Sequence, residues 1–249
     1  MSIIRSWRRF LAATLLMVAE SGATGVGATG VGATGAGGTG AGATGAASPS
    51  AAEAGAALLR AAGDGDAARV QALLAEGAPL EARDADGNTP LLRATLANAE
   101  AAAKVLIEAG ADVNAKNAMQ DSAYLYAGAR GHNGILARTL RHGADLRSTN
   151  RYGGTALIPA CERGLVETVR MLLEAGVDPN HVNRLGWTGL LEAIILSDGG
   201  PDHQAVVALL IAGGADVNLA DGDGRSPLRH ARQRGQAATA QLLLAAGAR

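Results

Sequence analysis

Apolar side chains recur at three- and four-residue spacings in a stretch near the middle of the chain. Ala103, Leu106 and Ile107 follow this spacing, which places them on one face of a helix that we expect over about 100–109. Gly110 comes next, and glycine is the residue that most readily takes the left-handed conformation that ends many helices. The pattern therefore predicts an amphipathic helix that stops at this glycine.

A second, shorter helix is predicted just before it. Thr89 is suited to cap a helix, and Pro90 falls at the first helical position, where the missing N–H costs nothing. The polar run 111–121 that follows Gly110 has no strand-like alternation and is expected to form an extended, hairpin-like loop. One unit of the chain is thus two short helices and a loop.

This unit recurs along the chain, as the closing glycines show: Gly77, Gly110, Gly143, Gly176, Gly214 and Gly247. Most are 33 residues apart, and a fixed period of this length indicates a repeat array. One helix pair cannot bury its own apolar face, so neighbouring units must stack. The expected units are 51–83, 84–116, 117–149, 150–182, 183–220 and 221–249.

The unit resembles the ankyrin repeat. The Thr89-Pro90-Leu91 start and the end from Gly110 to Ala115, read as GADVNA, match that family's motifs. The resemblance covers about 51–249 and implies an all-α ankyrin repeat solenoid of about six helix-turn-helix repeats with hairpin-like loops.

Two units depart from the motif at the start of their first helix. The third has Ser122-Ala123-Tyr124-Leu125 in place of the usual start, so we expect that helix to be less well specified. The fourth has Ala156 at the usual proline position and Pro159 deeper in the helix. Proline inside a helix costs about 3 kcal/mol, so this helix should start late or be kinked.

The later units carry two further departures. A five-residue insertion within 197–204 is expected to form a loop between the helices of the fifth unit. The last unit should end the stack with a polar cap, since it carries Arg229, Arg232, Gln233, Arg234 and Gln236.

The N-terminus has the layout of a secretory signal peptide over 1–21. Arginines precede the apolar run 10–19, and small residues follow it. That run is about half of what a membrane span needs, so we expect no stable span after cleavage. A twin-arginine signal and an untranslocated tail are the alternatives. The segment 22–50 repeats a Gly/Ala/Thr pentapeptide with almost nothing to bury, and it is predicted to be a flexible, disordered linker.

Composition narrows the classes of function. The formal net charge is −1 and no basic tract is present, which argues against nucleic-acid binding. The single cysteine, Cys161, allows no internal disulfide and is predicted to be packed and inert. We expect no cofactor.

No converging set of catalytic residues is apparent. His132 lies where the family usually has a histidine that bonds a neighbouring loop, and a structural role is expected for it. The other histidines lack metal-ligand spacing. The pair Asp202-His203 in the insertion is the one set worth following, against the alternative of a solvated loop. The Asp84 and Asp221 loops superficially resemble calcium loops but lack the distal glutamate, so no metal site is predicted.

Partner binding is what the resemblance implies. In the family, ligands are gripped by the hairpin tips and by the exposed ends of the first helices, which line a concave surface. Carried over position by position, the predicted partner-binding residues are Met119, Arg130, Arg151, Tyr152, Arg163, Arg184, Leu185, Trp187, Arg225 and Arg234. Exposed aromatic residues and methionine are enriched in interfaces, and arginine suits carboxylate-bearing partners. The alternative is that Trp187 only shields the next hairpin and the arginines form a solvated face.

The sequence therefore predicts a non-enzymatic, monomeric protein of the bacterial periplasm or exterior that binds an unidentified protein with an acidic surface. Similar exported ankyrin proteins act in oxidant protection or as immunity proteins against secreted effectors, and either role would fit. An envelope-tethered scaffold with an uncleaved N-terminus is the main alternative, and a hydrolase is a third hypothesis.

Overall fold

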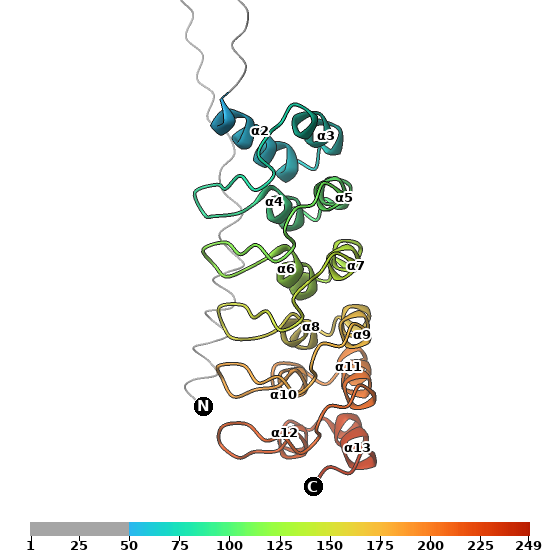
Figure 1. Ribbon diagram of the computed structural model, residues 1–249. Coiled ribbons are helices and arrows are strands. Elements are labelled where there is room, and N and C mark those ends of the chain that lie inside the picture. The colour runs from blue at the N-terminus through green and yellow to red at the C-terminus, as the bar shows by residue number, and fades with distance from the viewer. Residues whose placement is uncertain (1–49) are drawn as a thin grey trace, which may run out of the picture. The chain divides into compact units, whose positions relative to one another are not determined.

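The computed structural model describes residues 50–249, and the predicted signal peptide and most of the predicted linker lie outside them. The described chain is a stack of helix pairs joined by loops (Figure 1). In order the helices are α2 (Ala51–Gly63), α3 (Ala67–Ala75), α4 (Pro90–Leu96), α5 (Glu100–Glu108), α6 (Ala123–Arg130), α7 (Asn133–Arg141), α8 (Leu157–Glu162), α9 (Val166–Glu174), α10 (Gly189–Ile195), α11 (Pro201–Ala212), α12 (Pro227–Gln233) and α13 (Ala237–Ala245).

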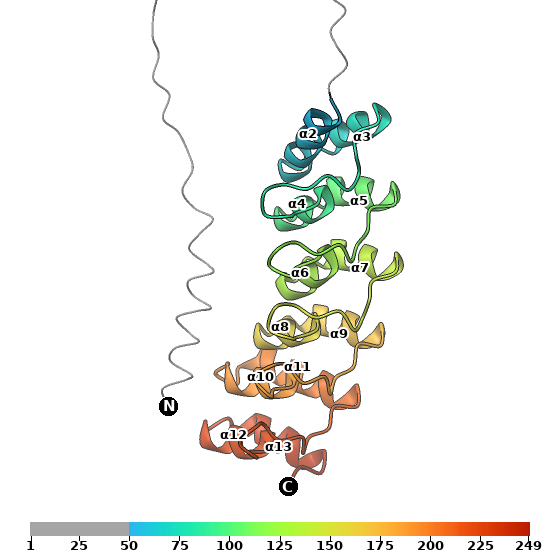
Figure 2. The ribbon, with the colours of Figure 1, turned by 60° about the vertical axis from the view of Figure 1, so that its left-hand side comes forward.

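The pairs lie one above another in two columns. One column holds the first helix of each pair, the even-numbered helices α2 to α12, and the other holds the second helices, the odd-numbered α3 to α13 (Figures 1 and 2). The loops between units all project from the side of the first helices. The all-α solenoid predicted from the period is therefore confirmed, with six helix pairs among the described residues.

The first helices begin at side-chain caps. Thr89 Oγ1 accepts the N–H of Leu92 at 3.2 Å, and Ser122 Oγ accepts that of Leu125 at the same distance. The expectation that the third unit would have a poorly specified helix start was wrong. A serine hydroxyl satisfies the free N–H of the first turn as well as threonine does, so the absent proline matters little.

The fourth unit starts its first helix late, as Pro159 predicted. Helix α8 begins at Leu157, which makes Pro159 its third residue, and Ala156 precedes it without a side-chain cap. A proline ring clashes with the carbonyl four residues earlier, which here belongs to Thr155. Thr155 holds the position of the capping residues in other units, yet its buried hydroxyl has no hydrogen-bond partner in the described structure.

The first unit has helix where the others have a loop. Helix α2 is 13 residues long and begins at Ala51, so its first turns occupy the positions that correspond to the hairpin 84–89. Ser50 and Glu53 bond each other's backbone N–H groups in a capping box that fixes this start.

The core is built from leucine, isoleucine, valine and alanine of both columns. Representative side chains have no exposed surface at all: Leu58, Leu91, Leu106, Ile135, Leu172 and Leu210. The closing glycine needs its special conformation, since Gly110 has φ of 92°. Small side chains let the units approach, so stability comes from stacking along the array.

In three units a polar side chain at the start of the second helix bonds the unit before. His132 Nδ1 donates to the carbonyl of Thr95 at 3.0 Å, so the predicted structural role of His132 is confirmed. Gln236 Nε2 donates to the carbonyl of Ile194 at 3.0 Å. His203 plays the same part, because its Nε2 lies 3.0 Å from the carbonyl oxygen of Glu162.

The insertion of the fifth unit was wrongly predicted to be all loop. Helix α11 begins at Pro201, so the extra residues are divided between a short turn and one more turn of helix. Proline at the first helical position and Asp202 in the first turn both favour a helix start there. Asp202 and His203 therefore lie on a helix and not in a solvated loop.

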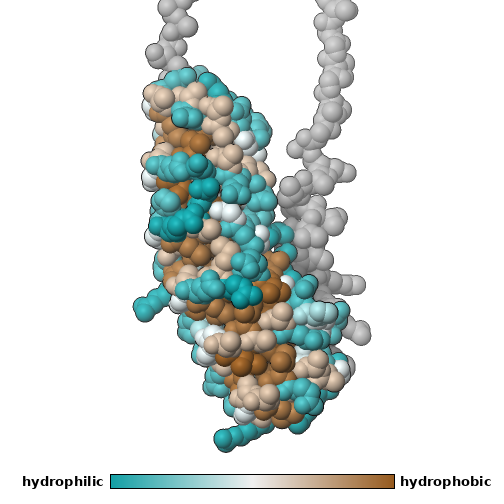
Figure 3. All heavy atoms as spheres, turned by 90° about the vertical axis from the view of Figure 1, so that its right-hand side faces the viewer, coloured by the Kyte–Doolittle hydropathy of each residue, from teal (hydrophilic) through white to brown (hydrophobic). Residues whose placement is uncertain are grey.

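The C-terminal end of the stack is only partly capped. Arg229 and Arg232 on α12 are exposed at positions that are buried and uncharged in the preceding units, as predicted for a cap. Gln236 is buried instead, because it bonds the unit before. Helix α13 carries no charged residue, and Leu244 is 40% exposed. Brown, apolar surface gathers over this end of the outer face (Figure 3).

Candidate partner-binding face

The loops between units share one internal frame. The side chain of an Asp or Asn at the loop start accepts two backbone N–H groups, those two and four residues later. Asn117 Oδ1 accepts from Met119 and Asp121, both at 2.9 Å. Asn183 Oδ1 accepts from Leu185 at 2.9 Å and Trp187 at 3.1 Å. The same bonds are made by Asp84, Asn150 and Asp221.

Neighbouring loops are also bonded to each other. Backbone N–H groups donate across units, from Ala118 to the carbonyl of Asp86 and from Arg184 to that of Tyr152, each at 3.0 Å. Arg184 Nη1 also donates to the carbonyl of Arg151 at 2.7 Å. These bonds join neighbouring loop tips, so the five loops are not independent of one another and the spacing of the bonded tips is fixed.

Met119, Tyr152 and Leu185 hold the same loop position in successive units. Met119 is 45% exposed, whereas Tyr152 and Leu185 are half-buried. Arg151 links the first two, because its guanidinium lies 4.8 Å from the centre of the Tyr152 ring and its Nη1 is 3.4 Å from the sulfur of Met119. Here the structure does bring predicted site residues together.

Arg130 stands beside this row at the end of α6. Its guanidinium lies 5.3 Å from the centre of the Tyr126 ring, and that ring meets His132 edge-on. Both arginines are thus positioned by aromatic faces, which leaves their N–H groups available for carboxylates.

Asp121 lies among these cations and was not among the predicted site residues. Burial raises the pKa of its carboxyl, and the nearby charges of Arg151, Arg130 and Lys116 act in the opposite direction. No basic group comes within 4 Å of this carboxylate among the ion pairs of the described residues. The sequence did carry a signal for Asp121. This loop position holds an acid here but the uncharged residues Gly154 and Trp187 in the next two units.

The predicted arginine stripe is present but interrupted. Arg163 is exposed at the end of α8, and Arg234 is exposed at the end of α12, where its Nη2 donates to the carbonyl of Ser197 at 3.1 Å. Leu196 takes the intervening position in the fifth unit. Glu162, next to Arg163, is half-buried, and burial raises the pKa of its carboxyl.

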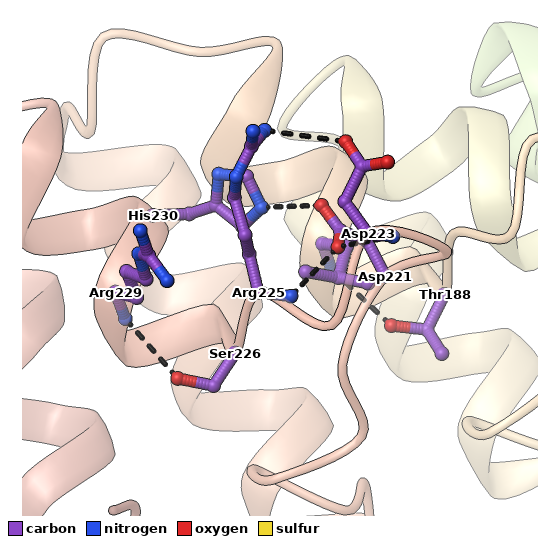
Figure 4. Close-up of polar contacts among 8 residues, drawn as sticks. Thr188, Asp221, Asp223, Arg225, Ser226, Arg229 and His230 are labelled. Carbon is purple, nitrogen blue, oxygen red and sulfur yellow. Dashed lines mark hydrogen bonds and ion pairs between the residues drawn. The ribbon is translucent and has the colours of Figure 1, made fainter.

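The remaining predicted residues are less accessible or are paired. Trp187 is half-buried, as a residue that shields the next loop would be. Arg225 makes an exposed ion pair with Asp223 at 3.3 Å (Figure 4). The structure therefore groups Met119, Arg130 and Arg151 in one cluster and leaves Arg225 and Arg234 at the far end of the face.

A second pattern links some of the loops to a side chain of their own first helix, nine residues after the loop start. Asp221 accepts a bond from His230 Nε2 at 2.7 Å (Figure 4), and Asp84 lies 3.9 Å from Arg93. Burial would raise the pKa of Asp221, but hydrogen bonds from Arg225, His230 and Asp223 outweigh it, and the pKa is lowered. In these two units, a basic side chain of the first helix lies against the acid at the loop start.

The fifth unit breaks this pattern with Glu192. Glu192 is only 6% exposed, and Asn183 Nδ2 donates to its Oε1 at 2.7 Å. Burial, with a further contribution from Glu162, raises the pKa of Glu192 to about 8. The sequence analysis did not predict a role for Glu192. A signal was present, because Glu192 follows Asn183 by nine residues, whereas at this spacing two other units have a basic residue after an Asp.

A shallow pocket of about 610 Å³ opens at the N-terminal end, beside the first turns of α2. Arg60, Arg83 and Arg93 supply its basic groups and Asp84 its acid. Small side chains form most of the rest: Ala51, Ala52, Gly55, Ala56, Leu59, Pro79 and Ala82.

The cysteine thiol and the possible metal ligands of residues 50–249 provide no reactive site there. Cys161 is fully buried, and burial raises the pKa of its thiol. No three His, Cys, Asp or Glu side chains are arranged to hold a metal ion within residues 50–249. Within the same residues, none of the helices combines the length and the apolar character needed to cross a bilayer.

The comparison with known proteins agrees with the geometry. The family model for ankyrin repeats in three copies matches residues 45–117 and 123–221. This chain belongs to the ankyrin repeat family. Ankyrin repeats are protein–protein interaction modules, and the family generally serves as a non-enzymatic binding scaffold.

Individual relatives support the same assignment. The ankyrin repeat protein YahD of Escherichia coli strain K12 is 55% identical over 58 residues, which is 23% of this chain and 29% of that protein. The chain thus spans less than a third of this curated relative.

Solved structures match over a much larger share. An ankyrin repeat domain from Acinetobacter baumannii AYE is 59% identical with a TM-score of 0.76, over 77% of this chain and 98% of that one. The ankyrin repeat domain of Bcl-3, a member of the IkappaB protein family, is 28% identical with a TM-score of 0.70, over 78% and 86%.

Proposed function

We propose that this ankyrin repeat protein is a non-enzymatic binding protein that grips an acidic segment of a partner protein with the loop row and first-helix ends of its third to fifth repeats. One observation carries the proposal. Arg130, Arg151, Arg163 and Arg184 lie along this face, and none forms an ion pair within 4 Å among the described residues.

The contacts that these arginines do make leave them preorganised. Aromatic rings support Arg130 and Arg151, and a loop carbonyl holds Arg184. A guanidinium held in place loses less side-chain entropy when a carboxylate binds it. Met119 and the Tyr152 ring add apolar surface of the kind that anchors interfaces.

Affinity capture with matched baits tests the proposal. The wild-type chain is compared with Arg130→Glu/Arg163→Glu, and with Arg69→Glu/Arg141→Glu on the opposite, second-helix column as a control of equal charge change. We expect a partner held by the wild type and the control but lost, by at least about tenfold in affinity, with the first variant. Its binding should weaken as salt rises, since exposed charge pairs are screened.

If both variants retained the partner equally, the partner would bind to a different face of the protein. No retained protein with any bait would overturn the proposal of an acidic protein partner.

We further propose that the protein acts in the periplasm or outside the cell, in stress protection or effector immunity. The arginine-led apolar run within 1–21 supports export. Cell fractionation with N-terminal sequencing tests this, and a mature protein that starts after residue 21 in a soluble envelope fraction is expected. Intact protein that begins at Met1 and sediments with membranes would favour the alternative, a tethered scaffold.

A further inference from the structure

The first repeat contains an arginine without the acid that its position would pair with elsewhere. In the second repeat the loop-start acid Asp84 lies 3.9 Å from Arg93, nine residues on. The equivalent pair in the first repeat is Ala51 and Arg60, because α2 takes the place of a loop and its first residue is alanine. Arg60 is exposed, and it forms no ion pair within 4 Å among residues 50–249.

The shallow pocket beside α2 brings this arginine together with Arg83 and Arg93. Arg83 Nη1 donates to the carbonyls of Gly87 and Lys116, both at 2.8 Å, and these bonds hold its guanidinium without supplying a negative charge. The acid in the pocket lining is Asp84, whose carboxylate already accepts three hydrogen bonds within its own loop. The lining therefore carries a net positive charge.

Helix α2 contributes an apolar wall to this pocket. Its lining side chains are small or apolar and share one face of the helix: Ala51, Ala52, Gly55, Ala56 and Leu59. At about 1.5 Å per residue they extend over about 12 Å of the helix. Glycine is needed where the helix meets the following loop, since a Cβ on Gly55 would lie 2.9 Å from the Cβ of Ala82. The space between this helical face and residues 79–84 is an elongated groove, which we call the α2 groove.

The two ends of the α2 groove differ in chemistry. Arg60 follows Leu59 in the last turns of α2, and Arg93 Nη2 lies 3.3 Å from where a Cβ of Gly63, the last residue of that helix, would be. Alanines form the opposite end, at the start of the helix. A groove with a cationic end and an apolar end suits a ligand with an anionic head and an apolar tail.

We propose that the α2 groove binds an aliphatic carboxylic acid of the fatty-acid class, with its carboxylate at Arg60 and Arg93 and its tail along α2 towards Ala51. A guanidinium can donate two parallel N–H bonds to a carboxylate, which fixes the head group. A stripe of about 12 Å matches a chain of about nine carbons with bonds of about 1.5 Å. Binding removes the tail and the alanine face from water.

Other occupants fit less well. An extended peptide would bring N–H and C=O groups that need partners, whereas the backbone of α2 is bonded within the helix and its first turn is capped by Ser50 and Glu53. Inorganic phosphate would engage the arginines but not the apolar wall. Residues 22–49, which precede the helix, include no acidic side chain for Arg60.

The α2 groove goes beyond the proposed partner-binding function. It is formed by the first two repeats, whereas the proposed partner face belongs to the third to fifth, and the two share no residue. Either proposal can therefore fail without the other.

Calorimetric titration of the full chain with octanoate tests the proposal. We expect saturable binding that Arg60→Glu weakens by at least about tenfold, since a charged hydrogen bond is lost and a like charge is added. Arg141→Glu is the matched control, because Arg141 is also exposed and without an ion pair within 4 Å in the described structure. It should bind octanoate like the wild type. Absence of octanoate binding, or equal loss in both variants, overturns the proposal.

Related probes separate the head from the tail. From butanoate to octanoate each added methylene should tighten binding by about two- to fourfold, because more apolar surface leaves water. Octylammonium, with the same tail and the opposite charge, should not bind. Equal binding of butanoate and octanoate, or of octylammonium and octanoate, contradicts the proposal. Tighter binding of an apolar tripeptide with a free C-terminus would assign the groove to a peptide end instead and overturn it.

Amide NMR spectra locate the ligand. Octanoate should shift the signals of Gly55, Arg60 and Ala82, which surround the α2 groove, and leave those of α13 unchanged. Shifts that gather on α13 and not on α2 would show that the acid binds another apolar surface, which contradicts the proposal.

Discussion

At the scale of single residues, Glu192 shows how a buried side chain links this fold to pH. The carboxyl loses water on folding and gains only one amide hydrogen bond, from Asn183. Burial penalises the charged form, so the folded protein keeps a proton that the unfolded chain releases.

Because the folded protein holds this proton more tightly than the unfolded chain does, the free energy of unfolding falls as pH rises. The pKa of Glu192 is raised from 4.5 to about 8, so its contribution to stability is complete below pH 4.5 and is lost as pH rises towards 8. Over that window the free energy of unfolding should fall by about 1.4 kcal/mol per pH unit from this group. Denaturant unfolding of wild type and Glu192→Gln at pH 5, 7 and 9 checks this. The variant should lose most of that slope, and parallel profiles would contradict the assignment.

Cys161 gives a second prediction at this scale. Its thiol is fully buried and its pKa is raised, and the thiolate is the reactive form. A thiol-specific colour reagent should therefore not react with the native protein within minutes but should react fully in denaturant. Fast modification without denaturant would mean that the packing around α8 opens readily.

At the scale of elements, the first helices differ in how they start. Ser122 caps α6, so Ser122→Ala should reduce the free energy of unfolding by about 1 kcal/mol through the loss of one N-cap bond. Thr155→Ala should cost much less, because the Thr155 hydroxyl has no partner to lose. Thermal unfolding of the two variants makes the comparison, and equal losses would show that the caps do not differ.

The packing of the second helices gives a larger effect. Leu172 on α9 has no exposed surface, so Leu172→Asp would bury a charge without a partner and should cost about 4 kcal/mol or more. Leu244→Glu on the exposed side of α13 should change stability by less than about 1 kcal/mol. An unchanged melting temperature for Leu172→Asp would contradict the register of the fourth repeat.

At the scale of the whole molecule, the free energy of unfolding is approximately a sum of the stability of each repeat and of its interfaces with the neighbouring repeats. Each inner repeat packs on two others and each terminal repeat on one, so the ends should open first. Amide hydrogen exchange should show the greatest protection in α6 to α9 and the least in α2, α3 and α12. Uniform protection along the array would instead indicate a single cooperative unit.

Much of this arrangement was predictable because it is local and periodic. The positions of Thr89, Pro90 and Gly110 relative to the apolar residues predict where helices start and end, and the 33-residue period predicts that they stack. Met119 and Arg151 could be placed on loop tips by the same register.

The rest depended on contacts between units, which a single unit does not encode. The bond from His203 to the carbonyl of Glu162 joins α11 to the repeat before, and no spacing within the fifth unit predicts it. Glu192 is buried, and Leu185 and Trp187 are half-buried, although the register places Leu185 and Trp187 on a loop tip.

The sequence by itself determined the repeat, its length, its helix pairs and the register of side chains on them, because each depends on spacings within about 33 residues. The tertiary structure decided which side chains of that register remain exposed. Leu173 and Leu244 hold the same position in their repeats, but Leu173 lies against Gly213 of the next repeat, whereas Leu244 is 40% exposed in the described array. Exposure depends on what stacks next, and that is a property of the assembled array.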